Sequence, residues 1–216
     1  MIMHNSVDNL LSIKKEIREI NPNSELIVVT KTFSMEKILP IVELGHKHFG
    51  ENKVQEAEAK WTDIKSKNNN LKLHLIGRLQ TNKVKFCLPL FDYIHGLDSL
   101  KLADKIANEQ IIKKFRPKIF IQINIGDEDQ KNGISQNNLL QFYNKIKNDF
   151  ELDIIGLMCI PPFGKDSSTY FQQMKNLSKK TNLNELSMGM SDDYLEALKY
   201  SATFIRVGSK IMGKRN

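Results

Sequence analysis

Two hydrophobic periodicities alternate along this chain. Short apolar runs typical of strands recur eight times, and longer stretches with apolar residues three and four positions apart separate them. The expected strands cover residues 26–31, 48–50, 72–77, 93–97, 118–125, 154–160, 185–188 and 203–207. The expected helices cover residues 34–44, 54–65, 81–89, 99–115, 135–148, 168–181 and 192–200.

A strand followed by a helix, repeated with no linker rich in Pro, Gly or Ser, is typical of a parallel α/β fold. We therefore predict one domain over residues 1–216, a single (β/α)8 TIM barrel with an extra N-terminal helix. The alternative is an open doubly wound sheet, which the absence of a GxGxxG turn after the first strand disfavours. Serines at positions expected for helix N-caps are Ser34, Ser99, Ser135 and Ser191.

Composition narrows the classes of protein. The longest apolar runs, 26–29 and 154–160, are too short to cross a bilayer. The amphipathic N-terminal stretch lacks the uninterrupted apolar centre of a signal peptide, so we expect a cytosolic protein. The net charge of +7 comes mostly from lysines without interleaved aromatic residues, so we expect no nucleic-acid partner. Cys87 and Cys159 cannot form a disulfide framework, and their apolar neighbours indicate buried thiols.

In a barrel, functional residues gather where the strands end. Along the first expected strand a period of two puts Ile27, Val29 and Lys31 on one face. Either Lys31 has left the strand and reaches solvent, or its amine is kept partly neutral and forms an imine with a carbonyl. Deprotonating an ordinary lysine at pH 7 costs about 5 kcal/mol, which burial and a nearby cation can offset.

The last expected strand carries Arg206, whose permanent charge requires a partner when buried. Either a carboxylate inside the barrel supplies that partner, although few of the expected strands carry an interior acidic residue, or Arg206 is the cation that lies near Lys31. Gly208 and Ser209 follow and open a short helix, where free backbone N–H groups favour a phosphate.

The seventh expected strand runs into a second glycine-containing loop. Ser187, Gly189 and Ser191 could complete a phosphate cup with hydroxyls and a close backbone approach, or the loop is a plain turn with Ser191 as a cap. The first alternative requires Asp192 and Asp193 to point away from the phosphate.

Weaker candidates occupy the other strand ends. Asn52 and Gly77 lie at the functional rim by position. His46 and His48 form an HxH pair without a convincing third ligand, so we expect no metal. Two further histidines, His74 and His95, fall within expected strands and are interpreted as core or packing residues.

Seven motifs, in this order, resemble those of the YggS-type pyridoxal phosphate homeostasis proteins: VVTKTFS, HFGENKVQEAEAKW, LHLIGRLQTNK, IQINIGDEDQKNGIS, GLMCIPP, LSMGMSDDYLEA and IRVGSKIMGKR. The resemblance covers nearly the whole chain and implies a barrel like the N-terminal domain of fold-type III enzymes such as alanine racemase. It implies that Lys31 holds pyridoxal 5′-phosphate as a Schiff base and that Arg206 faces the pyridine nitrogen. It further places the phosphate among residues 187–191, Gly208 and Ser209, with Asn52 along the ring and Lys131 as a secondary contact.

Function can be narrowed further from that resemblance. An arginine at the pyridine nitrogen makes the ring a weak electron sink, which suits racemisation or storage better than transamination. The chain ends eight residues after Gly208, so we expect no second domain of the racemase type and no opposing acid or base. We therefore expect a monomeric cytosolic protein that buffers the cofactor or delivers it to apo-enzymes, without robust catalysis. The alternatives are an amino-acid racemase and a Schiff-base aldolase acting on a sugar phosphate.

Overall fold

The computed structural model describes residues 5–128 and 130–213, which form a closed barrel of eight parallel strands, with β1 paired to both β2 and β8. The strands are β1 (Glu25–Val29), β2 (His48–Glu51), β3 (Lys72–Leu75), β4 (Tyr93–Leu97), β5 (Lys118–Ile123), β6 (Asp153–Cys159), β7 (Glu185–Ser187) and β8 (Phe204–Val207). The α-helices are α1 (Asn5–Ile20), α2 (Met35–Glu43), α3 (Val54–Lys67), α4 (Val84–Cys87), α5 (Leu100–Lys113), α6 (Leu139–Asp149), α7 (Ser167–Thr181), α8 (Tyr194–Lys199) and α9 (Ser209–Met212). Two 3-10 turns, η1 (Thr81–Lys83) and η2 (Gln136–Asn138), precede α4 and α6.

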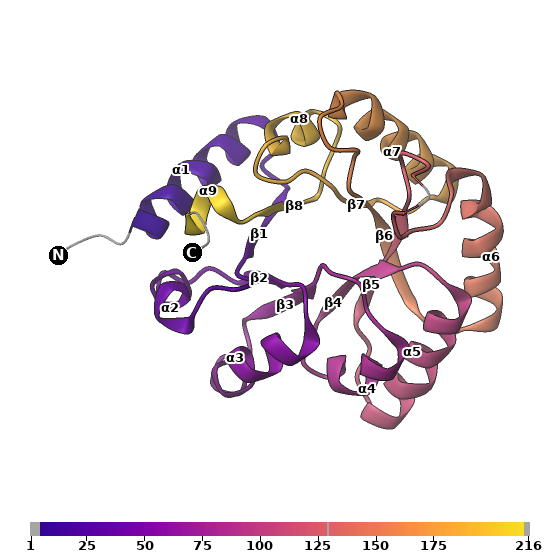
Figure 1. Ribbon diagram of the computed structural model, residues 1–216, viewed down its shortest axis with the longest axis horizontal. Coiled ribbons are helices and arrows are strands. Elements are labelled where there is room, and N and C mark those ends of the chain that lie inside the picture. Colours follow the sequence, from indigo (N-terminus) through magenta and orange to yellow (C-terminus); the bar gives the residue numbers. More distant parts are fainter. Residues whose placement is uncertain (1–4, 129, 214–216) are drawn as a thin grey trace.

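Figure 1 shows the strands as a ring with the helices outside it. The predicted (β/α)8 barrel is confirmed, and the closure between β1 and β8 excludes the open sheet. Helix α1 lies across this closure and contacts α2, α8 and α9. The first and last parts of the barrel are therefore held together by sheet hydrogen bonds and by a layer of helices.

Both faces of the sheet are buried, as expected for parallel strands covered by helices. Outward-facing residues such as Val28 and Leu73 belong to the large core beneath the helices. Inside the ring, Ile27, Phe120, Met158 and Phe204 form a separate apolar cluster. The period of two along each strand thus divides the side chains between two cores.

The first strand is shorter than the sequence predicts. It ends at Val29, because the chain turns at residues 31 and 32, where Thr32 has a left-handed φ of 68°. Lys31 therefore stands in this turn, half-buried, and not at the end of a regular strand.

The predicted caps have mixed outcomes. The Ser99 hydroxyl accepts a hydrogen bond from the backbone N–H of Leu102, which confirms it as the cap of α5. Ser34 and Ser135 precede α2 and η2 without a side-chain cap bond. The prediction for Ser191 is wrong, because α8 begins later and Asp193 occupies its N-cap position.

The cysteines, the helix lengths and the metal-ligating side chains bear on three further predictions. Cys87 and Cys159 are buried free thiols, as predicted. No helix within residues 5–128 and 130–213 is long and apolar enough to span a membrane. The same residues contain no group of three or more His, Cys, Asp or Glu side chains arranged to hold a metal ion.

Candidate functional site

Five strand ends bring the predicted site residues to one mouth of the barrel. Parallel strands in a closed barrel end at the same face, so residues after β1, β2, β3, β7 and β8 surround one opening. They are Lys31 after β1, Asn52 after β2, Gly77 after β3, Ser187, Gly189 and Ser191 at and after β7, and Arg206, Gly208 and Ser209 at and after β8. Because β1 and β8 are neighbours, the lysine turn and the Gly208 loop start side by side.

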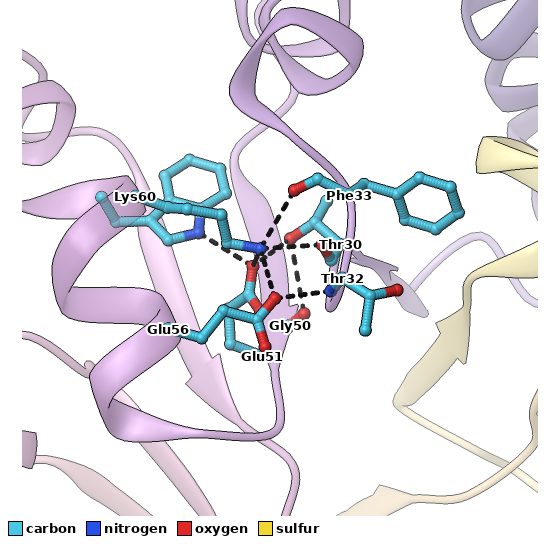
Figure 2. Close-up of polar contacts among 8 residues, drawn as sticks. Thr30, Thr32, Phe33, Gly50, Glu51, Glu56 and Lys60 are labelled. Atoms are coloured by element: carbon cyan, nitrogen blue, oxygen red, sulfur yellow. Dashed lines mark hydrogen bonds and ion pairs between the residues drawn. The ribbon is translucent and has the colours of Figure 1, made fainter. Parts of the chain in front are cut away.

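The turn that carries Lys31 is held from behind by charged side chains (Figure 2). The Lys60 ammonium donates to the Thr30 carbonyl at 2.9 Å and to the Phe33 carbonyl at 3.4 Å. The Glu56 carboxylate accepts the backbone N–H of Thr32 at 2.5 Å and lies 2.9 Å from the Lys60 nitrogen. The backbone on both sides of Lys31 is therefore fixed by side chains of α3.

Glu51, at the end of β2, forms the centre of this arrangement. Its side chain is fully buried, and its Oε1 accepts from Lys60 at 2.7 Å, from Trp61 Nε1 at 3.0 Å and from the Thr30 hydroxyl at 2.7 Å. A carboxylate leaves water at a high cost unless it is paired and hydrogen-bonded, which these three donors achieve for one of its two oxygens. We call Glu51, Glu56 and Lys60 the ionic clamp. Sequence reasoning assigned no role to any of its members.

Arg206 points into the barrel and is only 4% exposed. Its two terminal nitrogens donate to the Ser187 hydroxyl at 2.6 Å and to the Cys159 carbonyl at 2.9 Å. Burial lowers the pKa of Arg206, but a guanidinium keeps its charge in proteins. These hydrogen-bond partners are neutral oxygens, so the alternative of a salt bridge to a carboxylate inside the barrel is not what the structure shows.

Ser187 stands with Arg206 inside the barrel and is 0% exposed. Besides the bond from Arg206, its hydroxyl lies 2.8 Å from Nδ1 of His95. That ring is linked in turn to His74 at 2.9 Å. The interpretation of His74 and His95 as satisfied core residues is confirmed, but the sequence did not indicate that they join Ser187 and Arg206.

The two glycine loops meet next to the lysine turn. The Ser191 hydroxyl accepts the backbone N–H of Gly208 at 3.3 Å, which links the loop after β7 to the loop after β8. Gly189 has a left-handed φ of 86°, and a Cβ there would lie 2.6 Å from Ala197, so both conformation and space require glycine. A Cβ on Gly208 would lie 3.3 Å from Cβ of Val29, two residues before Lys31.

The two acids of this region are placed differently. Asp192 is exposed, whereas Asp193 accepts the Met190 backbone N–H at 2.6 Å. Burial raises the pKa of Asp193, and this hydrogen bond and the charge of Arg206 oppose that shift.

Asn52 and Gly77 are in direct contact. A Cβ on Gly77 would lie 2.3 Å from the carbonyl oxygen of Asn52, so only glycine allows the ends of β2 and β3 to approach this closely. Lys131 donates to the carbonyl of Pro161 at 3.2 Å and forms an ion pair with Glu128, three residues earlier in the same loop.

Comparison with known proteins defines the class first. Residues 6–216 match the family model described as "Alanine racemase, N-terminal domain". An alanine racemase of Clostridium difficile 630 has the same fold, with a TM-score of 0.75 at 13% identity over 97% of this chain and 56% of that one.

The particular family follows from closer relatives. A pyridoxal phosphate homeostasis protein of Pasteurella multocida is 36% identical, with 96% of this chain and 97% of that protein covered. The structure of PipY of Synechococcus elongatus PCC7942 with PLP bound is 31% identical, with a TM-score of 0.85 over 96% of this chain and 100% of that one. The chain belongs to the pyridoxal phosphate homeostasis protein family, as its motifs predicted.

Proposed function

We propose that this protein holds pyridoxal 5′-phosphate as a Schiff base on Lys31 and acts in homeostasis of that cofactor, by buffering it or delivering it to apo-enzymes, without robust catalysis. The observation that carries the proposal is the pairing of β1 with β8, which sets the lysine turn beside the Gly208 loop above a buried arginine. The cofactor bound by PipY and the names of the family members support the same ligand.

The residues present fit this group. A phosphate requires N–H and hydroxyl donors, and the loops after β7 and β8 offer Ser191, Ser209 and the first amides of α9. Gly189 and Gly208 let the backbone of these two loops pack closely against Ala197 and Val29, where a Cβ would be crowded. The Ser187 hydroxyl is committed to Arg206 and His95, so we assign Ser187 to the arginine and the phosphate to the other residues of the two loops.

When bound, the cofactor supplies an aldehyde that can condense with an amine and a ring that can accept electrons. Lys31 provides that amine, and condensation releases one water. The guanidinium of Arg206 only donates hydrogen bonds, so it would present an N–H group to the ring nitrogen without giving up a proton. Asn52 would line the ring, and Gly77 allows the backbone of Asn52 to approach the end of β3 closely. Because a Schiff base forms reversibly, the same site can release the cofactor to an acceptor protein.

Mass spectrometry after borohydride reduction tests the proposal. The wild-type protein incubated with pyridoxal 5′-phosphate should carry one reduced adduct on Lys31, and Lys31→Ala should carry none. Lys131→Ala is the matched control, because this lysine lies at the rim with partners of its own, Pro161 and Glu128. An adduct on another lysine, or full labelling of Lys31→Ala, would refute the assignment.

A racemase is the second candidate, and the shared fold of alanine racemase favours it. Exchange of alanine or serine stereochemistry separates the two functions. We expect turnover below about 1 per second, under the usual range of enzymes, and faster turnover that disappears in Lys31→Ala would favour the racemase. Light scattering checks the expected monomer, and activation of an apo-enzyme by the loaded protein checks delivery.

A further inference from the structure

A row of hydrogen-bonded side chains crosses the inside of the barrel beneath Arg206. From Ser187 on β7 it runs to His95 on β4 at 2.8 Å, to His74 on β3 at 2.9 Å and to His48 on β2 at 2.9 Å. We call these four side chains the histidine column. His74, His95 and Ser187 are 0% exposed, so the column is sealed except at His48.

Aromatic packing fixes the rings of the column. His74 is stacked on Tyr93, with ring centroids 4.1 Å apart, and His95 is stacked on Phe120 at 4.4 Å. Phe204 contacts the rings of the column from β8. Because aromatic side chains pack against these rings, the arrangement can vary mainly in which nitrogen carries each proton.

Arg206 decides the direction of the hydrogen bonds. A guanidinium only donates, so Ser187 accepts from Arg206 and uses its single proton for Nδ1 of His95. His95 then donates through Nε2 to His74, and His74 donates through Nε2 to Nδ1 of His48. In the reverse order Ser187 would receive two donors and its own proton would need a third partner.

The lower end of the column reaches solvent at the base of the barrel, where the strands begin. In the order set by Arg206, Nε2 of His48 carries a proton and faces the Glu25 carboxylate at 3.7 Å. His48 lines two cavities of about 430 Å³ each at this base. The charged and titratable groups that face His48 or line its two cavities are Lys14 and Arg18 from α1, Glu25 from β1, His46 and Lys47 from the segment before β2, Lys72 and His74 from β3, Asp92 and Tyr93 at the start of β4, and Glu185 from β7.

The column is uncharged near neutral pH. Burial lowers the pKa of His74 and of His95 well below the usual histidine value. Burial also lowers the pKa of His48, with Glu25 and Asp92 opposing the shift and Lys72 and Lys47 adding to it. A second proton on His48 must bind Nδ1, the atom that accepts from His74, so it removes the lowest bond of the column.

We propose that the histidine column positions Arg206 and makes its orientation responsive to protonation of His48 at the opposite end of the barrel. Ser187 and His95 are positioning residues, since they act on the cofactor only through the arginine. This inference rests on the proposed function and deepens it. Protonation of His48 at the base of the barrel would change how Arg206 is held at the cofactor site. Protonation at the base leaves the column without a fixed order and loosens the guanidinium.

The column can be tested without cofactor by nitrogen-15 NMR of the imidazoles and of the Arg206 side chain. We expect protonated Nε2 and unprotonated Nδ1 in His48, His74 and His95 at neutral pH, and separately resolved terminal nitrogens in Arg206. Ser187→Ala and His95→Leu should average the Arg206 signals. A protonated Nδ1 on His74 or His95, or resolved Arg206 signals in both folded variants, would overturn the proposal.

Cofactor titration tests the consequence. Ser187→Ala and His95→Leu should bind pyridoxal 5′-phosphate about tenfold more weakly, the loss expected for one hydrogen bond to a charged group. His95→Gln, which keeps a donor and an acceptor, should stay within about threefold of wild type. Failure of the wild type to bind would reject the proposed function, and the NMR experiment would still decide on the column.

The pH profile identifies coupling to the base. Wild-type affinity should fall on acidification as His48 gains its proton, and His48→Phe, which lacks the lowest bond of the column at every pH, should show the weaker binding throughout and lose this fall. His46→Gln is the control, because the His46 ring bonds to the His48 carbonyl and not to the column. An unchanged pH profile in His48→Phe would overturn the coupling.

Discussion

Lys31 and Arg206, two basic residues at the mouth, are held by opposite means. Behind the turn of Lys31 stands the ionic clamp, in which a buried carboxylate and an ammonium face each other at 2.7 Å. Arg206 rests on a hydroxyl and a backbone carbonyl, with neutral imidazoles behind them. The lysine's backbone is thus fixed by charges, whereas the permanent charge of the arginine is carried by uncharged partners. Salt, pH and mutation should therefore affect the two sides differently.

Removal of one partner of the ionic clamp should have the largest effect. Lys60→Met leaves the Glu51 carboxylate buried without its ammonium, which typically costs about 3–5 kcal/mol of unfolding free energy. It also frees the Thr30 and Phe33 carbonyls, so the turn of Lys31 should become mobile. Urea unfolding measures the first effect and the rate of borohydride-trapped adduct formation the second.

Lys145→Met is the matched control for that experiment. Lys145 pairs with Asp149 on the exposed face of α6, and such pairs contribute at most about 1 kcal/mol. If both substitutions cost the same, the clamp is no more than a surface ion pair and the contrast between the two sides disappears.

Acid should act on the histidine side first. Burial lowers the pKa of His46, whose ring donates to the His48 carbonyl, to about 3 from 6.5. A depressed histidine pKa gives stability that is fully present above 6.5 and is lost as the pH falls toward 3. The loss is about 1.4 kcal/mol per pH unit in that window for this ring alone. His74 and His95 act in the same direction.

The Glu56 carboxylate of the ionic clamp titrates in a different pH range. Hydrogen bonds from Thr32 and Lys60 hold the pKa of Glu56 below its usual value, so its contribution is present above 4.5 and is lost only at lower pH. The free energy of unfolding, measured with urea, should therefore be lower at pH 5.5 than at pH 7.5. His46→Gln should reduce this difference, and Glu56→Gln should leave it unchanged. If Glu56→Gln reduced the loss and His46→Gln did not, the acid sensitivity would belong to the ionic clamp and not to the buried histidines.

Glu56→Gln at neutral pH should have the smallest effect. The side chain of Glu56 is 26% exposed, and an amide oxygen can still accept from the Thr32 N–H. We expect a loss of about 1 kcal/mol, in the range of a partly exposed ion pair. A loss as large as that of Lys60→Met would mean that Glu56, and not Glu51, is the principal partner of the ammonium.

The barrel and the positions of the site residues could be predicted because each strand and helix has its own hydrophobic period. Lys31, Arg206 and Gly208 needed only the rule that function lies where the strands end. The end of β1 was less visible, because the turn at Thr32 depends on bonds from α3 that no local pattern reveals.

Contacts between distant strands were beyond the sequence. The period of two predicts that His48, His74 and His95 share a face of their strands with interior residues. It does not predict that three neighbouring strands place ring nitrogens 2.9 Å apart. Ser191 was misassigned because aspartate is as common as serine at N-cap positions, and α8 begins only after Asp193, while the Ser191 hydroxyl accepts from Gly208.

The pairing of β1 with β8 has a consequence for synthesis of the protein. Lys31 precedes Arg206 and the Gly208 loop in the chain, so it is translated before them. During translation the amine emerges from the ribosome long before the strand that completes its surroundings. A nascent or prematurely terminated polypeptide has no finished pocket, so capture of the ligand reports that the ring has closed.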